Sequence, residues 1–130
     1  MSNELLAPVS PGELIDKLTI LDIKSRRIAD PAKLANVRAE LDVLTRCWAQ
    51  SPFGKADVTA DRAALLAVNE RLWEIEDDIR DQERAKTFGA RFIELARAVY
   101  IENDERAAIK KRINVALGSA IIEEKSYAAY

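Results

Sequence analysis

Apolar side chains recur every three or four residues along most of this 130-residue chain, and this repeat most constrains its fold. The repeat places apolar residues on one face of an α-helix, whereas a half-buried strand alternates apolar and polar residues. No segment shows a sustained alternation, so the sequence predicts an all-α protein without a sheet. The clearest stripes are Leu14, Leu18, Leu21 and Ile28; Leu34, Val37, Leu41, Leu44 and Trp48; and Leu65, Val68, Leu72, Ile75 and Ile79.

The first two helices carry strong start signals. Ser10 and Glu13 are spaced as a capping box, with a proline at the first helical position, which favours a helix from Ser10 to about Ile28. Asp30-Pro31 supplies the same pair of cap and proline for a second helix. Because the connection is so short, we expect an antiparallel helical hairpin, preceded by an extended segment over residues 1–9.

The rest of the chain predicts two to four further helices. A third helix is expected over about 62–86. Helical spacing then resumes and continues to Gly118, a typical residue after a helix C-terminus; Asn103-Asp104 either caps a separate helix or lies inside an uninterrupted one. A short last helix is expected over about 119–125. The predicted architecture is a single domain, residues 1–130, folded as a bundle of four to six helices.

Composition excludes several kinds of function. The chain has no histidine, which removes Ser-His-Asp and Cys-His catalytic systems and the common zinc sites. It has four glycines and no glycine-rich phosphate loop, so we predict no cofactor and no metal. A net charge of −2 predicts no nucleic-acid partner, and no apolar run is long enough for membrane insertion. Cys47 is the only cysteine, which suits the cytoplasm, and the first residues lack the features of a signal peptide.

Polar side chains lie beside the apolar stripe of the third expected helix. Glu76 and Arg80 fall on the rim of the apolar face, at the spacing of an i,i+4 ion pair, together with Asn69 and Glu83. The adjacent acidic run lies opposite the stripe and is expected to be solvated. The rim is either a half-buried ladder that orients helix packing or the wall of a polar pocket.

The first helix also carries a carboxylate at an unexpected place. On a helical wheel Asp22 falls on the core face, whereas Asp16, Ile20 and Ile23 fall on the back. A buried carboxylate needs a partner, which a cation of a later helix would supply. The two isoleucines on the back hint at a contact with a second copy of the chain.

The last third of the chain carries a polar stripe with the opposite charge. Arg106, Lys110 and Asn114 follow Asn103 on one helical face, and such donors can hold a carboxylate, a phosphate or sugar hydroxyls. The alternative is that this stripe pairs with the acidic ladder of the third helix. The candidate ligand-binding residues are therefore Asp22, Glu76, Arg80, Arg106, Lys110 and Asn114.

Four segments together resemble a small bacterial family of unknown function. They are VSPGELIDKLTILDIK (residues 9–24), NERLWEIEDDIR (69–80), FIELARAVY (92–100) and EEKSY (123–127). The resemblance implies a helical domain found in bacteria, in some cases associated with glycosyltransferases or surface polysaccharides. It implies no activity and no site residues.

Three functions are consistent with these residues, and binding is favoured over catalysis. The first is a binding or accessory module that recognises an anionic small molecule, such as a sugar phosphate or a nucleotide sugar. The second is a structural or protein-interaction module that acts as a homodimer. The third is a Mg²⁺-dependent phosphohydrolase built on carboxylates such as Asp22, Glu76 and Glu83.

Overall fold

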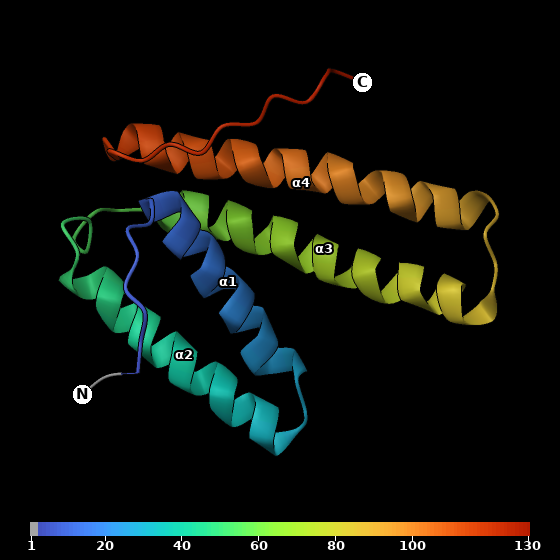
Figure 1. The fold of residues 1–130 in the computed structure, drawn as a ribbon, viewed down its shortest axis with the longest axis horizontal. Helices are drawn as coiled ribbons and strands as arrows, with labels where there is room; N and C mark the ends of the chain where they lie inside the picture. Colours follow the sequence, from blue (N-terminus) through green and yellow to red (C-terminus); the bar gives the residue numbers. More distant parts are fainter. Residues whose placement is uncertain (1–2) are drawn as a thin grey trace.

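The computed structural model describes residues 3–130, and this part of the chain contains four α-helices and no strand (Figure 1). The helices are α1 (Pro11–Arg27), α2 (Pro31–Gln50), α3 (Thr59–Ala85) and α4 (Ala90–Ala116). The prediction of an all-α bundle of four to six helices is confirmed. α1 and α2 form the expected hairpin, and α3 and α4 form a second, longer one (Figure 1). None of these helices is both long and apolar enough to cross a membrane.

Local signals explain where the helices begin and end. Ser10 Oγ accepts a hydrogen bond from the Glu13 backbone N–H (3.2 Å), and Asp30 Oδ2 accepts one from the Lys33 N–H (2.9 Å). Each cap satisfies a backbone donor that has no partner inside its helix. After α4, Gly118 has a φ of 66°, a left-handed conformation that glycine adopts without steric cost. The predicted starts of α1 and α2 and the predicted end of α4 are therefore confirmed.

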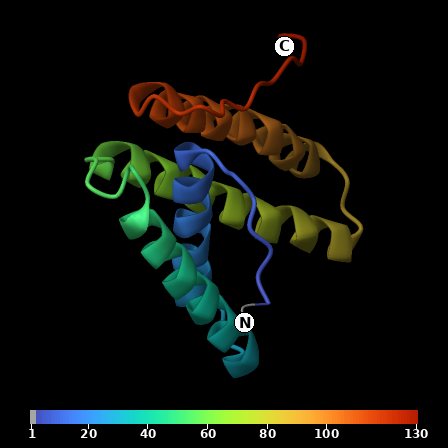
Figure 2. The same cartoon turned by 60° about the vertical axis from the view of Figure 1, so that its left-hand side comes forward.

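In the C-terminal part the structure decides between two open alternatives and corrects one prediction. α4 runs without a break through Asn103-Asp104, so the alternative with a separate helix there is wrong. The predicted short helix after Ser119 is also wrong. The Ser119 hydroxyl donates to the Ile121 carbonyl (2.6 Å) and accepts from the Ile121 N–H (3.1 Å), and such local bonds compete with a helix. Residues 119–130, here called the C-terminal segment, instead run without helix beside α4 (Figures 1 and 2).

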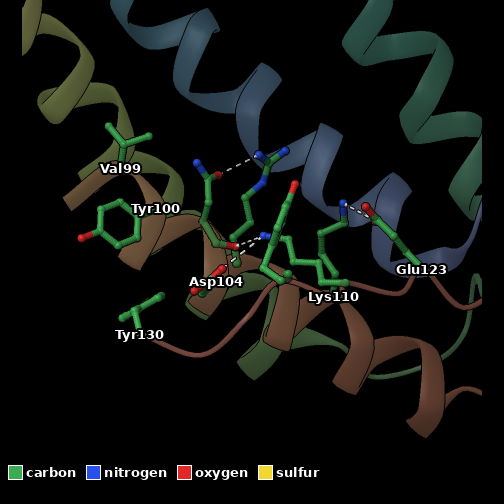
Figure 3. Close-up of a pocket in the computed structure, with 11 residues that line it drawn as sticks. Val99, Tyr100, Asp104, Lys110, Glu123 and Tyr130 are labelled. Carbon is green, nitrogen blue, oxygen red and sulfur yellow. Dashed lines mark hydrogen bonds and ion pairs between the residues drawn. The ribbon is translucent and has the colours of Figure 1, made fainter. Parts of the chain in front are cut away.

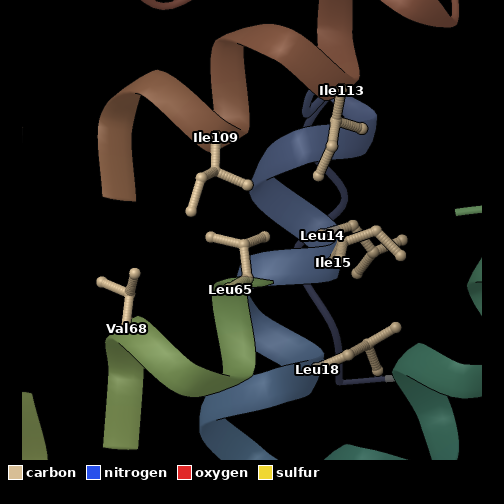
Figure 4. Packing of buried hydrophobic residues seen from close by; sticks show 7 residues of the cluster. All are labelled: Leu14, Ile15, Leu18, Leu65, Val68, Ile109 and Ile113. Atoms are coloured by element: carbon tan, nitrogen blue, oxygen red, sulfur yellow. The ribbon is translucent and has the colours of Figure 1, made fainter. Parts of the chain in front are cut away.

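α1 lies between α2 and the α3–α4 hairpin and contacts all three other helices. α2 packs mainly against α1, whereas α3 and α4 pack against each other and against α1. The hydrophobic core forms where α1 crosses the α3–α4 hairpin, and the far ends of α3 and α4 extend beyond α1 (Figure 1). The core residues are Leu14, Ile15, Leu18, Leu65, Val68, Ile109 and Ile113 (Figure 4).

The central position of α1 overturns the prediction of a single buried face. Asp16 and Ile23 are predicted to lie on the back of the helix, but each is only 1% exposed. Asp22, predicted to face the core, is half-buried and pairs with Arg26 at 3.4 Å on an exposed edge. A helix covered by neighbours on several sides buries residues around most of its circumference, so a one-faced wheel misplaces them. Ile23 is therefore a core residue and not part of a surface for a second copy.

Candidate ligand-binding site

The candidate site is built around a buried carboxylate on α1. Asp16 forms a two-point ion pair with Arg106 of α4, with an Nε–Oδ1 distance of 2.9 Å and an Nη2–Oδ2 distance of 2.5 Å. Two parallel hydrogen bonds are the preferred geometry of an arginine–carboxylate pair, and they fix the plane of the guanidinium. Asn69 of α3 donates to the same carboxylate (Nδ2–Oδ1 2.9 Å) and to the Thr19 hydroxyl (2.9 Å). Three helices therefore meet at Asp16.

The guanidinium of Arg106 is held on one edge and open on the other. Within residues 3–130, Nη1 makes one long hydrogen bond, to Asn103 Oδ1 at 3.5 Å, and the side chain is 28% exposed. The hydrogen bonds to Asp16 outweigh the effect of burial and raise the pKa of Arg106, so the side chain stays charged. An arginine fixed from behind by a carboxylate is already oriented for an anion on its open edge.

Lys110 lies one turn further along α4. Its Nζ lies 2.6 Å from Glu13 Oε2 and 3.1 Å from Glu123 Oε2 of the C-terminal segment (Figure 3), and 4.0 Å from Asp16 Oδ2. Burial alone would lower the pKa of Lys110, but the carboxylates of Glu13, Glu123 and Asp16 outweigh it and raise the pKa. Lys110 therefore joins α4 to the start of α1 and to the C-terminal segment, and acidic partners already balance its charge.

Asn114 caps α1 from outside. Its Oδ1 accepts a hydrogen bond from the Gly12 backbone N–H at 2.7 Å, and the residue is 1% exposed. A Cβ atom on Gly12 would lie 2.5 Å from the Lys110 carbonyl oxygen, so glycine is needed for the helices to approach this closely. Asn114 therefore satisfies one of the free donors at the start of α1.

The structure brings Glu76, Arg80 and Arg106 to one cavity and leaves Asp22 apart from it. Arg106 and Lys110 pair with α1 and the C-terminal segment, so the alternative in which this stripe pairs with the acidic ladder of α3 is wrong. Glu76 and Arg80 form the predicted i,i+4 pair at 3.3 Å, but their side chains are 49% and 71% exposed, so this pair is not half-buried. Asp22 lies apart from the site, on the edge of α1 beside Arg26.

Among the cavities that Arg106 lines, two are lined by Asn103 as well. The first, here called the tryptophan cavity, has a volume of about 520 Å³ and lies among α1, α3 and α4. Its other lining residues include Ile20, Asn69, Trp73, Glu76, Asp77 and Arg80. The second, the tyrosine cavity, has a volume of about 400 Å³ and lies between α4 and the C-terminal segment (Figure 3). Its other lining residues include Tyr100, Asp104, Lys110, Lys125, Tyr127 and Tyr130.

No group of three carboxylate or cysteine side chains among residues 3–130 lies close enough together to hold a metal ion. Asp22 and Glu76 each pair with an arginine of the same helix, and Glu83 is exposed. The carboxylates named for a metal-dependent hydrolase therefore do not converge in the described part of the chain.

A family model matches residues 5–130, almost the whole chain. The chain belongs to DUF6165, a family of unknown function. The predicted membership in a family of unknown function is thus confirmed. No curated protein and no solved structure matches this DUF6165 chain. Its function therefore has to be argued from the geometry of the site.

The acidic half of the site escapes prediction from the sequence. Asp16 and Glu13 lie off the main apolar stripe of α1, where carboxylates are usually solvated. One signal was present: Glu13 and Asp16 are three residues apart and Arg106 and Lys110 are four apart, so each pair shares one face of its helix. The two faces carry opposite charges, and in the structure they form ion pairs with each other.

Proposed function

We propose that this DUF6165 protein binds an anionic small molecule, such as a sugar phosphate or a nucleotide sugar, with the anion at Arg106. The open edge of this guanidinium, fixed by a buried carboxylate, is the observation that carries the proposal. Arginine donors in a planar fork match the oxygens of a phosphate. Because Asp16 holds the guanidinium in place, little side-chain freedom is lost when an anion binds.

The tryptophan cavity supports a ligand that also contains a sugar. Its volume of about 520 Å³ lies within the usual range for small-molecule sites. Trp73 offers an aromatic wall, whereas Glu76 and Arg80 offer an acceptor and a donor that are both solvent-accessible. One apolar wall with a few polar groups is the usual composition of a small-molecule pocket.

Titration calorimetry against a panel of sugar phosphates and nucleotide sugars tests the proposal, with Arg80→Ala as the site variant. Arg46→Ala is a matched control, because Arg46 is also an exposed arginine in an i,i+4 ion pair, with Asp42 of α2. We expect at least one panel member to bind, and Arg80→Ala to raise its Kd about tenfold, while Arg46→Ala leaves it within twofold. If no panel member binds, or if both variants change the Kd equally, the proposal is wrong.

We also propose that residues 1–130 act as one domain in the cytoplasm, which a single cysteine without a disulfide partner supports. A sugar-containing ligand agrees with the surface-polysaccharide context that the family resemblance implies, and this context stays a prediction. The homodimer and the Mg²⁺-dependent phosphohydrolase stay alternative hypotheses. A homodimer would need a surface other than Ile23, and the hydrolase predicts a loss of turnover in Glu76→Gln.

A further inference from the structure

The tryptophan cavity and the tyrosine cavity differ in the side chains that line them. In the tryptophan cavity, Glu76 and Arg80 pair with each other but stay largely exposed, and together with Asp77 they offer acceptors and a donor that suit several hydroxyl groups. In the tyrosine cavity the charged side chains are also paired: Lys125 Nζ lies 3.3 Å from Asp104 Oδ1, and Lys110, which is only 10% exposed, is paired with Glu123. The surface that this cavity offers to a ligand is therefore mainly aromatic.

The aromatic surface of the tyrosine cavity comes from α4 and the C-terminal segment. Tyr100 and Tyr130 meet edge to face, with ring centroids 5.1 Å apart (Figure 3). Lys125 Nζ lies 5.6 Å from the ring centroid of Tyr127. Flat rings bind well against such aromatic side chains, largely independently of the pattern of hydrogen-bonding groups on the ring.

We propose that one ligand spans both cavities, with a phosphate-containing linker at Arg106, a sugar ring against Trp73 and a flat heteroaromatic ring against Tyr100. This inference rests on the proposed function and narrows it from anionic ligands in general to those with two ring groups joined by phosphate. Arg106 and Asn103 line both cavities, so a single linker at this point reaches each of them. The volumes of about 400 and 520 Å³ lie in the lower part of the range for small-molecule sites, which suits one ring group in each.

Tryptophan fluorescence can follow one half of the site alone. The chain has two tryptophans, Trp48 and Trp73, and Trp48 lines neither cavity but packs against the core and stacks on Phe53. In a Trp48→Phe background, Trp73 is the only tryptophan. The probes are glucose 1-phosphate, the nucleoside monophosphates of uracil, thymine, adenine and guanine, and the corresponding nucleoside diphosphate glucoses. Calorimetry gives the Kd of each probe, and fluorescence shows whether Trp73 is contacted.

We expect at least one nucleoside diphosphate glucose to bind about tenfold or more tightly than either of its halves. Trp73 fluorescence should respond to this probe and to glucose 1-phosphate, but not to the monophosphate. Tyr100→Ala should weaken the two-ring probe and the monophosphate about tenfold and leave glucose 1-phosphate within twofold. Phe88→Ala removes an exposed aromatic residue at the far end of the α3–α4 hairpin and should change no Kd, which makes it the control.

The outcomes separate this inference from the proposed function. Arg106→Lys keeps the charge beside Asp16 but loses the planar fork, so it should weaken every phosphate probe about tenfold if the proposed function is right. If one-ring probes bind and depend on Arg106, but no two-ring probe binds more than twofold tighter than its halves, only the two-cavity ligand is wrong. The same holds if Tyr100→Ala weakens all probes equally. If no probe binds at all, both proposals are wrong.

Discussion

Arg106→Met should destabilise the protein more than Asp16→Asn, although both substitutions break the same ion pair. The reason is the difference in burial: the Asp16 side chain is 1% exposed and the Arg106 side chain is 28% exposed. Without its partner, Arg106 can turn its charged end towards water. Asp16 cannot, and the methionine keeps the apolar stem of Arg106, so the comparison isolates the charge.

The expected magnitudes follow from what each variant leaves behind. Removing one partner of a buried ion pair costs about 3–5 kcal/mol of unfolding free energy. Asp16 would keep its hydrogen bond from Asn69 (2.9 Å) and the more distant Lys110 (4.0 Å), so we expect about 3 kcal/mol for Arg106→Met, the lower end of that range. For Asp16→Asn we expect about 1–2 kcal/mol, the cost of a lost charge-assisted hydrogen bond. The double variant leaves no unpaired charge and should be at least about 1 kcal/mol more stable than the sum of the single effects predicts.

Urea unfolding followed by circular dichroism measures these differences, provided that the slope of free energy against urea stays the same in all variants. Asp22→Asn is the matched control, because Asp22 lies on the same helix in an exposed ion pair with Arg26 and should change the unfolding free energy by less than about 1 kcal/mol. Equal effects of Arg106→Met and Asp16→Asn, or strictly additive effects in the double variant, would refute a buried Asp16 charge that orients Arg106.

Three further predictions use other parts of the same contact region. Gly12→Ala should lower the unfolding free energy by about 1–3 kcal/mol in urea unfolding, because the new Cβ would lie 2.5 Å from a backbone oxygen; Gly89→Ala, where nothing lies within 4 Å, should cost less than about 1 kcal/mol. The pKa of Lys110 is raised in the folded protein, so the ion pairs of Lys110 stabilise the fold below the pKa that this lysine has in the unfolded chain, and this stabilisation is lost as pH rises through its pKa in the folded protein. The unfolding free energy of the wild type should therefore fall above about pH 10, and that of Lys110→Met should fall less. Hydrogen bonding from Tyr130 lowers the pKa of Asp104, so the contact of the C-terminal segment with α4 should be present above the usual pKa of an aspartate and lost as pH falls below about 4. NMR signals of Tyr130 would report this loss, and in Asp104→Asn they should show that the contact is lost at neutral pH as well.

Much of the secondary structure could be predicted from the sequence because its signals are local. A cap and its partner lie three residues apart, as in Ser10 with Glu13, and the left-handed residue that ends α4 is a glycine. The Glu76–Arg80 pair is equally local, one turn apart on a single helix. The sequence left open whether Asn103-Asp104 caps a separate helix, and it wrongly predicted a helix after Ser119. Both cases concern residues that serve either as caps or as loop and surface residues, and the local pattern alone does not decide between these roles.

The site itself was decided by tertiary structure. Asp16 and Arg106 are 90 positions apart, and their pairing depends on α1 lying between α2 and the α3–α4 hairpin, where it is covered on more than one side. A helical wheel with one buried face predicts that Asp22 is the carboxylate in the core. In the structure the buried carboxylate is Asp16. The sequence by itself determined where helices form, because that depends on contacts within a turn or two. Only the packing of three helices decided which carboxylate is shielded from water, and hence which arginine is held ready for an anion.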